Sequence, residues 1–455
     1  MKSTTRRLAR GSRLPLLVIL ALLACALVLA ACGGGGSSSS SETTAATEEP
    51  AEETTGTEEG EEAESGGAPA AEKEATGEPI VTMTYTDVNT EGPQYKNIEE
   101  TERVYQEWIN SHGGIGGRPL EAKFCDARGT PTAAAACARE AVSDKAVAVV
   151  GNFTFTGDAV VPILEQANTA LFGNCCAISP LELTSKISFP MGNQPLYGVG
   201  LVHKAVEQGC EHIVGVIIEG AEAFEPLMEN AAKAEGTKIE KFIQLPGTAQ
   251  DYSAQVAEAT AGDTDCLVMV VSETPYIAWM PAFAQSGSEA RMYGPQGNFN
   301  ENAVKGFEST VEGDVIAGMY PALSLPQWSE YREALEKGEA DMSQDYNSLG
   351  GMGTWAAYEG FKQVVESMSG EIDNETFLKA AETAKINLPG LVPPLNMAEN
   401  WGNTGGPKGF ERIVNRCGTF SEFKEGKIVP LGDEFEDLSE IAGGTKPMDC
   451  GPAFG

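Results

Sequence analysis

Histidine is scarce in this chain, which has only three among its 455 residues: His112, His203 and His212. None of them stands in an HExxH pattern, and neither GxSxG nor GxxxxGK followed by Ser or Thr occurs. The common signatures of zinc hydrolases, serine hydrolases and P-loop nucleotidases are therefore missing. No CxxC pair is present, which removes the usual zinc-ligand spacing. We expect no enzyme activity, no metal site and no cofactor.

Positive charge is also in short supply. The chain has 31 Lys and Arg against 66 Asp and Glu, for a net charge of -35. Proteins that bind nucleic acids neutralise phosphates with Lys and Arg, so a chain this acidic is a poor partner for them. The balance says little about a small ligand in a cleft, and we expect no nucleic-acid partner.

A long apolar run lies at the N-terminus. It covers residues 14–31 and follows five cations within the first 13 residues, the order typical of a secretory signal. The run ends in Leu29-Ala-Ala-Cys32, which resembles the bacterial lipobox. We therefore expect residues 1–31 to be a signal peptide and Cys32 to be lipidated, leaving an exported protein anchored to the cell membrane. The alternatives are Cys25 as the lipidated residue and an uncleaved transmembrane helix, for which the run is short.

Residues 32–79 lack large apolar side chains. A Gly/Ser tract is followed by Glu, Thr and Ala, and residues 33–79 contain 13 glutamates and one lysine. Such a segment cannot bury enough apolar surface to offset its ordering entropy, and its like charges repel one another. The composition predicts a disordered acidic tether after the lipidated cysteine.

Eight cysteines follow the tether, and an exported chain favours disulfides between them. Their spacing alone does not determine the connectivity, because several pairings are compatible with one sequence. We expect the pairs Cys125 with Cys137, Cys417 with Cys450, and Cys210 with Cys266.

Strand and helix patterns alternate through most of the body. Short apolar runs predict strands, and amphipathic stretches between them predict helices. Alternation over this length indicates an α/β protein with parallel sheets covered on both faces. Glycine and proline clusters after the last helices weaken any strand prediction there. Strands are expected at 81–86, 120–124, 146–150, 170–173, 213–218, 266–271, 291–293 and 315–320. Helices are expected at 98–109, 131–142, 157–168, 196–208, 222–235, 252–261, 275–286, 327–337, 354–368 and 375–383.

The glycine-rich stretch Ile109 to Leu120, INSHGGIGGRPL, invites comparison with a phosphate-binding loop. In a dinucleotide site the glycines lie between a strand and the helix whose N-terminus faces the phosphates. Here a helix ends first, the glycines follow and a strand then begins. We expect a helix stop and a tight turn, not a nucleotide site.

Ligands of parallel α/β sheets bind beyond the carboxyl ends of the strands. Thr154 and Thr156 follow the third strand, where their hydroxyls and the N-H groups of the next helix could hold a carboxylate; ordinary helix capping is the alternative. Aromatic residues there, including Phe153, could cover a ligand or belong to the core. The candidates are Tyr95, Asn152, Thr154, Phe155, Thr156, Cys176, Ser179, Phe224, Ser272 and Gln296.

These features together resemble the Leu/Ile/Val-binding group of type I periplasmic solute-binding proteins, which serve ABC transporters. The resemblance covers residues 79–324 well and the remainder loosely. The matching motifs are Ile109-Asn110 with Gly113-Gly114-Ile115 and Gly117-Arg118, Asp126, residues 146–151, Pro180 to Thr184, and Gly294-Pro295.

The resemblance implies two Rossmann-like lobes with parallel central sheets, joined by crossover hinge strands and closing on a ligand. By analogy, lobe one would be 80–195 with 322–390, and lobe two 196–321 with 391–455. A monomer that delivers a small polar organic solute to an ABC permease is the implied function. The alternative is a sensor that signals to a membrane partner.

The family holds the ligand carboxylate near positions that match Thr154, Thr156, Cys176 and Ser179. Relatives that bind simple amino acids carry an acidic residue where this chain has Gln296, and a tyrosine where it has Ser272. A Tyr-Gly pair is likewise replaced around Phe224. Because a buried ammonium needs a charged partner, the ligand is expected to be an amide, a carboxylate or a larger amino-acid derivative.

Overall fold

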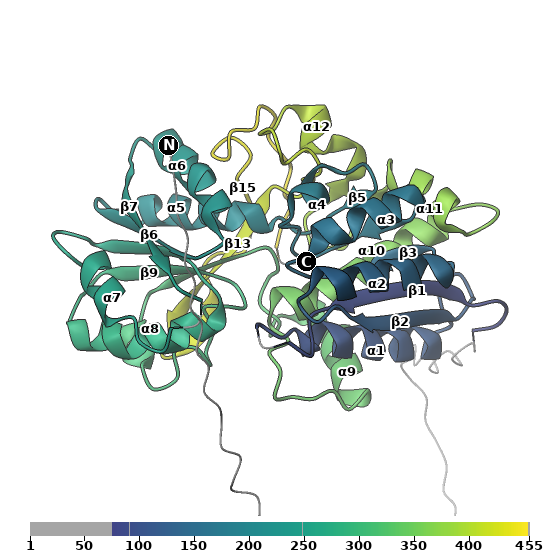
Figure 1. The fold of residues 1–455 in the computed structure, drawn as a ribbon, viewed down its shortest axis with the longest axis horizontal. Coiled ribbons are helices and arrows are strands. Elements are labelled where there is room, and N and C mark those ends of the chain that lie inside the picture. The colour runs from purple at the N-terminus through teal and green to yellow at the C-terminus, as the bar shows by residue number, and fades with distance from the viewer. Residues whose placement is uncertain (1–74, 91, 248, 454–455) are drawn as a thin grey trace, which may run out of the picture. The chain divides into compact units, whose positions relative to one another are not determined.

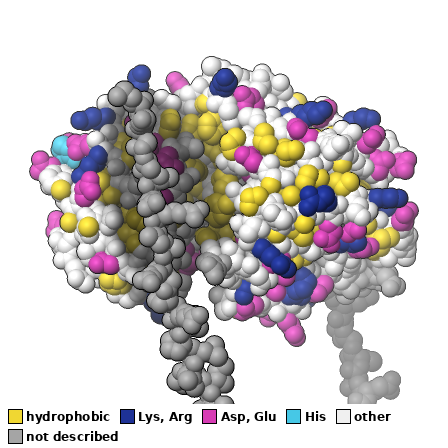
Figure 2. Space-filling model, viewed as in Figure 1, with side chains coloured by type: hydrophobic (Ala, Val, Ile, Leu, Met, Phe, Trp, Pro, Cys, Tyr) yellow, Lys and Arg dark blue, Asp and Glu magenta, His cyan; other side chains and the backbone are white. Residues whose placement is uncertain are grey.

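The computed structural model describes residues 75–453 except Glu91 and Thr248. The predicted signal peptide, Cys32 and nearly all of the tether lie outside the described residues. Within residues 75–453, no helix has the length and apolar character needed to cross a membrane. The described residues belong to one compact unit, 69–455, and on the face shown in Figure 2 its acidic side chains are dispersed among uncharged ones.

Two separate sheets form the body of this unit (Figure 1). The first has the strand order β2-β1-β3-β4-β5, and all its pairs are parallel. Helices α1, α9 and α10 contribute to the core on one face, and α2 and α3 to the core on the other. The strands are β1 (Ile80–Thr86), β2 (Leu120–Asp126), β3 (Ala148–Val150), β4 (Ala170–Phe172) and β5 (Ser188–Phe189). The helices are α1 (Lys96–Ser111), α2 (Pro131–Ser143), α3 (Val161–Gln166), α9 (Ser329–Lys337), α10 (Leu349–Ser367) and α11 (Asn374–Ala381).

The second sheet has the order β14-β13-β10-β9-β8-β6-β7, with the short β15 paired to β13. Helices α5 and α6 pack on one face, and α7 and α8 on the other. The strands are β6 (Ile213–Ile218), β7 (Ile239–Leu245), β8 (Cys266–Val270), β9 (Arg291–Pro295), β10 (Val315–Gly318), β13 (Cys417–Lys424), β14 (Lys427–Pro430) and β15 (Glu436–Asp437). The helices are α5 (Tyr197–Glu207), α6 (Glu225–Ala234), α7 (Ser253–Ala259) and α8 (Glu273–Ser286).

The remaining elements are short. They are α4 (Pro180–Thr184), α12 (Trp401–Thr404), and the two-stranded antiparallel pair β11 (Lys385–Ile386) with β12 (Leu395–Asn396). The expected α/β class with parallel sheets is thus confirmed. The tail departs from expectation, because β13 pairs antiparallel with β10 and with β14. The second sheet is therefore mixed.

Three connections run between the two sheets, and hydrogen bonds tie them together. Asn193, after β5, donates its amide to the carbonyl of Cys417 at 2.7 Å, and Asn415 donates to the carbonyl of Met191 at 3.1 Å. Thr419 donates its hydroxyl to the carbonyl of Tyr320 at 3.2 Å. The chain thus passes three times through one hydrogen-bonded region, although the exact lobe boundaries stay a prediction.

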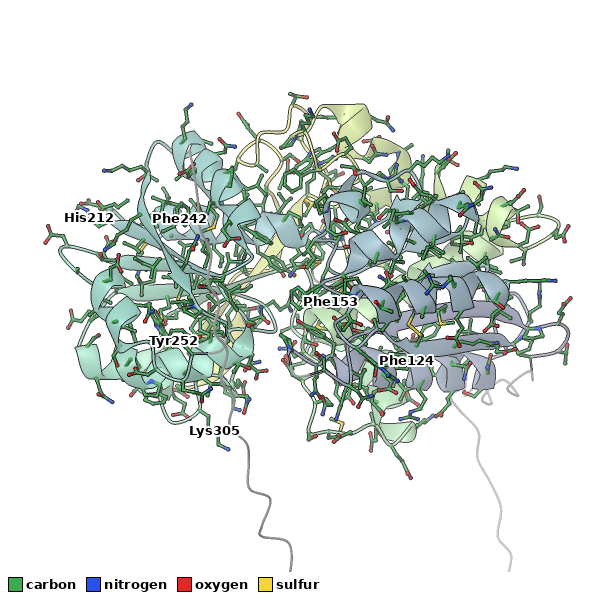
Figure 3. The ribbon with its side chains drawn as sticks, viewed as in Figure 1. Phe124, Phe153, His212, Phe242, Tyr252 and Lys305 are labelled. Atoms are coloured by element: carbon green, nitrogen blue, oxygen red, sulfur yellow. A yellow bond between two sulfur atoms is a disulfide. The ribbon has the colours of Figure 1, made fainter. Side chains whose placement is uncertain are left out.

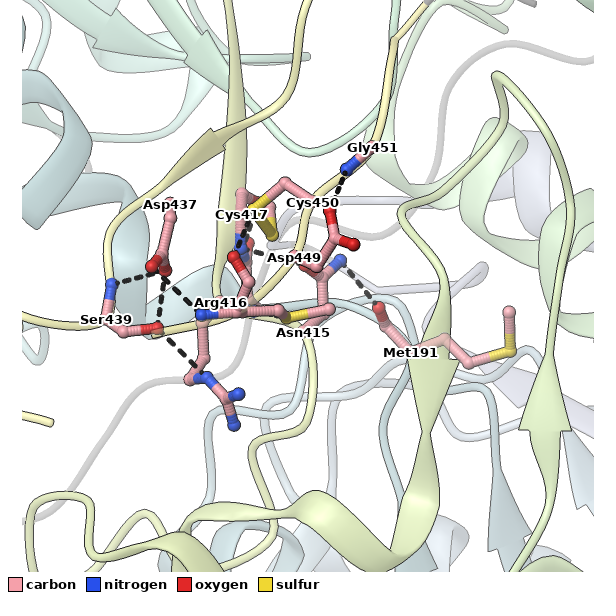
Figure 4. Close-up of a disulfide and its surroundings, with 11 residues drawn as sticks. Met191, Asn415, Arg416, Cys417, Asp437, Ser439, Asp449, Cys450 and Gly451 are labelled. Atoms are coloured by element: carbon pink, nitrogen blue, oxygen red, sulfur yellow. Dashed lines mark hydrogen bonds between the residues drawn. A yellow bond between two sulfur atoms is a disulfide. The ribbon is translucent and has the colours of Figure 1, made fainter. Parts of the chain in front are cut away.

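Three disulfides close loops in the body, and they join the pairs expected from the sequence: Cys125 with Cys137, Cys210 with Cys266, and Cys417 with Cys450. Figure 4 shows the last of these beside Arg416, which donates to the Ser439 hydroxyl at 3.0 Å. The tail is thereby attached covalently to the first residue of β13.

The glycine-rich stretch forms the expected helix stop and turn. Helix α1 ends at Ser111, and the Asn110 side chain bonds both the N-H and the carbonyl of Leu120, where β2 begins. Gly114 has φ +69, and a Cβ there would lie 2.1 Å from the carbonyl oxygen of Arg118. Only glycine fits that backbone. The order of helix, glycines and strand is confirmed.

Candidate functional site

Two asparagines lie side by side where β3 and β4 end. Val150 pairs with Phe172 in the parallel register, so Asn152 and Asn174 occupy matching positions two residues farther on. Both side chains are fully buried, and neither the oxygen nor the nitrogen of either carboxamide has a hydrogen-bond partner. Because buried polar atoms are normally paired, four unpaired atoms at one sheet edge indicate a place that receives a polar group.

Two tyrosines from outside the first sheet add unpaired hydroxyls. Tyr197 is the first residue of α5, and Tyr320 lies in the connection after β10; both are at least 97% buried, and neither hydroxyl has a partner. Burial raises the pKa of each well above its ordinary value, and the Cys175 and Cys176 thiols raise it further. The tyrosines and the cysteine pair after β4 are therefore neighbours. We call Asn152, Asn174, Tyr197 and Tyr320 the unpaired cluster.

Helix α10 packs against this cluster through a glycine. A Cβ on Gly353 would lie 2.5 Å from the Cβ of Cys175 and 3.0 Å from the hydroxyl of Tyr320. Both residues therefore contact the same turn of the helix. We call each sheet with the helices that cover it a half of the molecule. The unpaired cluster combines residues that follow the first sheet, the start of α5 in the second half and a connection between the halves. A movement of one half relative to the other would therefore change the distances within the cluster.

An aromatic group continues from the cluster toward the surface. The ring of Tyr95 meets Phe153 edge to face, with centroids 4.7 Å apart, and Phe153 meets Phe155 at 5.2 Å. Phe153 is 4% exposed, whereas Phe155 is 54% exposed. In Figure 3, Phe153 lies in the middle of the view, on the side of its half that faces the other. Burial raises the Tyr95 pKa, with Cys176 the next cause, which places Tyr95 near the cysteine pair.

The two threonines have a different arrangement from the one expected. Thr154 is fully buried and donates its hydroxyl to the Asp87 carboxylate, 3.0 Å from each oxygen, while Thr156 contacts the Thr154 hydroxyl at 3.0 Å. The segment after them, Gly157–Ala159, is a short 3-10 helix without a side-chain cap. A ligand carboxylate at Thr154 would therefore approach the negative charge of Asp87 and compete with it for one hydroxyl hydrogen.

Ser179 and Cys176 follow β4 as expected, but Ser179 has a local partner. Its hydroxyl accepts the N-H of Glu182 at 3.3 Å, and the Glu182 carboxylate accepts the N-H groups of Ser179 and Ile178. This capping box starts α4. Burial raises the pKa of Glu182 to about 7, although the two N-H groups oppose the shift. Cys176 is 5% exposed and lies beside the unpaired cluster, near Tyr197 and Tyr320.

The candidates from the second half lie apart from the cluster or are already bonded. Gln296 donates to the carbonyl of Tyr320 at 2.9 Å and accepts the N-H groups of Met319 and Tyr320. Ser272 begins α8 without capping it, and Phe224 packs on the core beneath α5 and α6. Gln296 therefore holds the connection that carries Tyr320. Both polar atoms of its carboxamide have hydrogen-bond partners, whereas those of Asn152 have none.

Two hollows are found on the described surface, one beside Gln296 and one on the C-terminal segment. The first, of only about 10 Å³, is bordered by Gln296, Tyr320 and Thr419. The second is a more open depression of about 330 Å³, bordered by Arg416 and by Lys446, which pairs with Glu399. Neither hollow is lined by Asn152 or Asn174. In this conformation the candidate site is therefore identified by its unpaired polar atoms and not by a hollow.

Among the described residues, two clusters have metal-ligand atoms close together, and both have other uses. Cys210 and Cys266 form a disulfide beside Asp265. The carboxylates of Glu207 and Glu436, near His203, are each 2.6 Å from the Lys204 ammonium. The lysine already supplies the positive charge that a metal ion would bring.

Sequence reasoning named Asn152, Tyr95 and Cys176 of these neighbours. It missed Tyr197 and Tyr320. The sequence predicted a strand at 315–320 that would include Tyr320. In the structure β10 ends at Gly318, so Tyr320 lies outside the sheet.

A family model described as "Periplasmic binding protein" matches residues 92–411. No curated protein matches the chain. Solved structures with a similar fold include a substrate-binding periplasmic protein from Ralstonia solanacearum, with 16% identity, a TM-score of 0.64, and coverage of 77% of this chain and 99% of that one. A leucine-binding protein from Thermotoga maritima has 16% identity, a TM-score of 0.62, and coverage of 78% and 98%. A fatty acid ABC transporter substrate-binding protein from Thermomonospora curvata has 18% identity, a TM-score of 0.65, and coverage of 82% and 95%.

Proposed function

The chain belongs to the periplasmic binding protein family, as its motifs predicted, and we propose that it captures a small uncharged polar solute outside the cytoplasm and delivers it to an ABC permease. The family is one of extracytoplasmic solute-binding proteins, not of enzymes. The observation that carries the proposal is the pair Asn152 and Asn174, whose buried carboxamides lack any protein partner.

The chemistry of the unpaired cluster favours an uncharged ligand group. Asparagine offers both a donor and an acceptor, and tyrosine offers a hydroxyl that can serve as either. The groups that affect the pKa of Tyr197 and Tyr320 are the Cys175 and Cys176 thiols and a tyrosine phenol, and none of them is a carboxylate or a basic group. A buried ligand carboxylate would find no cationic partner among these groups, whereas an amide or urea-like group would match the carboxamides.

The surroundings add a reason against a free carboxylate. Asp87 holds the Thr154 hydroxyl that was expected to bind one, and Glu182 is buried nearby in α4. Tyr95, Phe153 and Phe155 supply an apolar wall for the remainder of the solute. The lipid anchor at Cys32 and a monomeric state are further parts of this proposal, consistent with the N-terminal sequence.

The proposal is tested by recovering what the protein carries. The full chain is purified from an exporting host, denatured, and its small molecules are identified by mass spectrometry; calorimetry with that solute then compares Asn152→Ala, Asn174→Ala and the exposed control Asn387→Ala. Each of the first two loses roughly 10- to 100-fold in affinity, and the control stays unchanged. Small-angle scattering should show compaction with the solute.

The asparagine substitutions should leave the free protein stable, since neither side chain makes a hydrogen bond. We expect changes in the free energy of unfolding within about 1 kcal/mol. Unchanged affinity in both variants, or a solute that binds without compaction, would argue against the proposed capture.

A further inference from the structure

Cys175 and Cys176 are the two cysteines of the described residues that are not in disulfides, and they are adjacent in the chain. The other six described cysteines are all paired. Three disulfides are typical of a protein that matures in an oxidising compartment. The same compartment would act on two neighbouring thiols during folding, before they are buried.

The local backbone keeps the two residues in a turn. They follow β4 as the two turn residues of the segment 173–178, and a turn can place adjacent side chains on one side, which a strand does not. A Cβ on Gly192 would lie 1.7 Å from the Cys175 carbonyl oxygen, and one on Gly353 2.5 Å from the Cys175 Cβ. Two glycines thus allow neighbouring segments to close on this turn from two directions.

The Cys176 thiol also has the Cys175 side chain as a neighbour. Burial raises the pKa of the Cys176 thiol well above its ordinary value, and a hydrogen bond with the Cys175 thiol raises it further. Both residues are at least 95% buried. The thiols therefore lie within reach of each other beside Tyr197 and Tyr320, at the base of the unpaired cluster.

We propose that Cys175 and Cys176 are joined in the exported protein by a vicinal disulfide, a covalent modification that forms part of the wall of the ligand site. One thiolate attacks a disulfide of a small-molecule or protein thiol oxidant and releases one thiol. The second thiolate then attacks the mixed disulfide, releases the second thiol and closes the ring. Two electrons pass to the oxidant, and the two S-H hydrogens are lost as protons that its released thiols take up.

The bond differs from the other three in its constraint. Consecutive Cα atoms are about 3.8 Å apart, below the usual disulfide range of about 4.4 to 6.8 Å, whereas the other pairs have Cα separations of 5.6, 5.9 and 5.9 Å. Such strain makes a disulfide easier to reduce. The ring removes two S-H donors from the base of the unpaired cluster, where the two cysteines lie, and fixes the turn, so reduction changes the wall that faces the solute.

The experiment uses the full chain collected from an oxidising compartment and denatured in acid with an excess of N-ethylmaleimide. Cleavage after Lys145 and Lys186 releases one peptide, 146–186, whose only cysteines are Cys175 and Cys176. We expect this peptide to carry no maleimide and to be lighter than its reduced form by two hydrogen atoms. A peptide that carries two maleimides, or a thiol adduct from the medium, overturns the proposal.

A graded reduction supplies the second measurement and the control. Folded protein is incubated with increasing concentrations of a dithiol reductant before alkylation, and peptide 146–186 is compared with the peptides of the pair Cys417 and Cys450. The vicinal bond should open at a reductant concentration at least 10-fold lower. In Cys176→Ser, peptide 146–186 should carry one maleimide without reductant, because Cys175 then has no neighbour to pair with. Equal resistance of the two bonds would contradict the strain argument. Neither measurement needs the solute, so the result is independent of the proposed function.

Discussion

Buried carboxamides that follow the strands of the two sheets differ in their hydrogen bonding. Beyond the first sheet, Asn152 and Asn174 are buried with all four polar side-chain atoms unpaired. Beyond the second sheet, Gln296 is also buried, but its carboxamide holds the backbone of Met319 and Tyr320 through three hydrogen bonds. The same functional group is available for a solute at one sheet and used for structure at the other.

This difference assigns the two halves different tasks. The first half supplies polar atoms to the site, and the second half supplies α5 with Tyr197 and fixes the connection that carries Tyr320. Burying four unpaired polar atoms costs free energy unless something pairs with them, whereas the Gln296 bonds offset the burial of that connection. A solute would therefore be recognised mainly by the first half, and closure would bring the hydroxyls of the two tyrosines to it.

The largest expected effect comes from Gln296→Ala. The substitution leaves the N-H groups of Met319 and Tyr320 without their side-chain partner and removes one of the two hydrogen bonds to the Tyr320 carbonyl, and we expect a loss of roughly 3 kcal/mol in the free energy of unfolding. Urea denaturation of the ligand-free protein measures it. If Gln296 were instead a ligand residue, stability would be unchanged and only affinity would fall.

Ser272→Ala is the matched control from the same half. Ser272 is half-buried at the start of α8 and makes no capping bond, so its loss should alter stability by less than about 0.5 kcal/mol. A large decrease in the free energy of unfolding for Ser272→Ala would show that the second half is sensitive to any substitution. The effect of Gln296→Ala would then not report on its hydrogen bonds.

Much of the fold was predictable because buried strands are continuous apolar runs. The strand 213–218 was predicted with the bounds that β6 has, and the long helices were found within about five residues at their ends. The strand β7, Ile239–Leu245, was missed because it is an edge strand whose charged residues alternate with apolar ones. The strands β13 and β14 were missed because glycines and charges surround them, although pairing with β10 stabilises β13.

The site was less predictable than the fold. The rule on strand ends found Asn152 because that residue is local to its strand, but it could not tell a free carboxamide from the bonded one of Gln296. That distinction depends on Tyr320, 24 residues away. Tyr197 and Tyr320 come from elements that meet only through the crossing connections, so no pattern in the linear sequence joins them. Thr154 was expected to bind a ligand carboxylate. Its actual partner, Asp87, lies 67 residues earlier in the chain, and no local pattern in the sequence connects the two.

A pH dependence of intermediate size is expected at the first half from Glu182. Its folded-state pKa of about 7 exceeds the ordinary value of 4.5, so the folded protein holds this proton more tightly than the unfolded chain. Stability from this group is therefore greatest below about pH 4.5 and falls as pH rises to about 7, by roughly 2 to 3 kcal/mol. Denaturation curves at several pH values measure the slope.

The matched variant is Glu182→Gln, which keeps an oxygen to accept the N-H groups of Ser179 and Ile178 but cannot ionise. The decline in the free energy of unfolding between pH 4.5 and 7 should be smaller in the variant. The comparison must be a difference between the two proteins, because burial also raises the pKa of Glu102 to about 8 and that of Asp345 to about 6. Parallel curves would mean that Glu182 ionises normally.

A small effect on stability is expected at Phe155. Its side chain is 54% exposed, and its ring centroid lies 5.2 Å from that of Phe153 and 6.3 Å from that of Tyr95, so Phe155→Ala should cost less than about 1 kcal/mol. The buried neighbour in Phe153→Ala should cost roughly 3 kcal/mol. Urea unfolding compares the two, and calorimetry with the recovered solute then separates their roles. If Phe155 covers the solute, its loss weakens binding while barely changing stability. If Phe155→Ala changes neither the affinity nor the stability, then Phe155 does not contact the solute. Recognition by the first half would then be limited to the unpaired cluster and the rings of Phe153 and Tyr95.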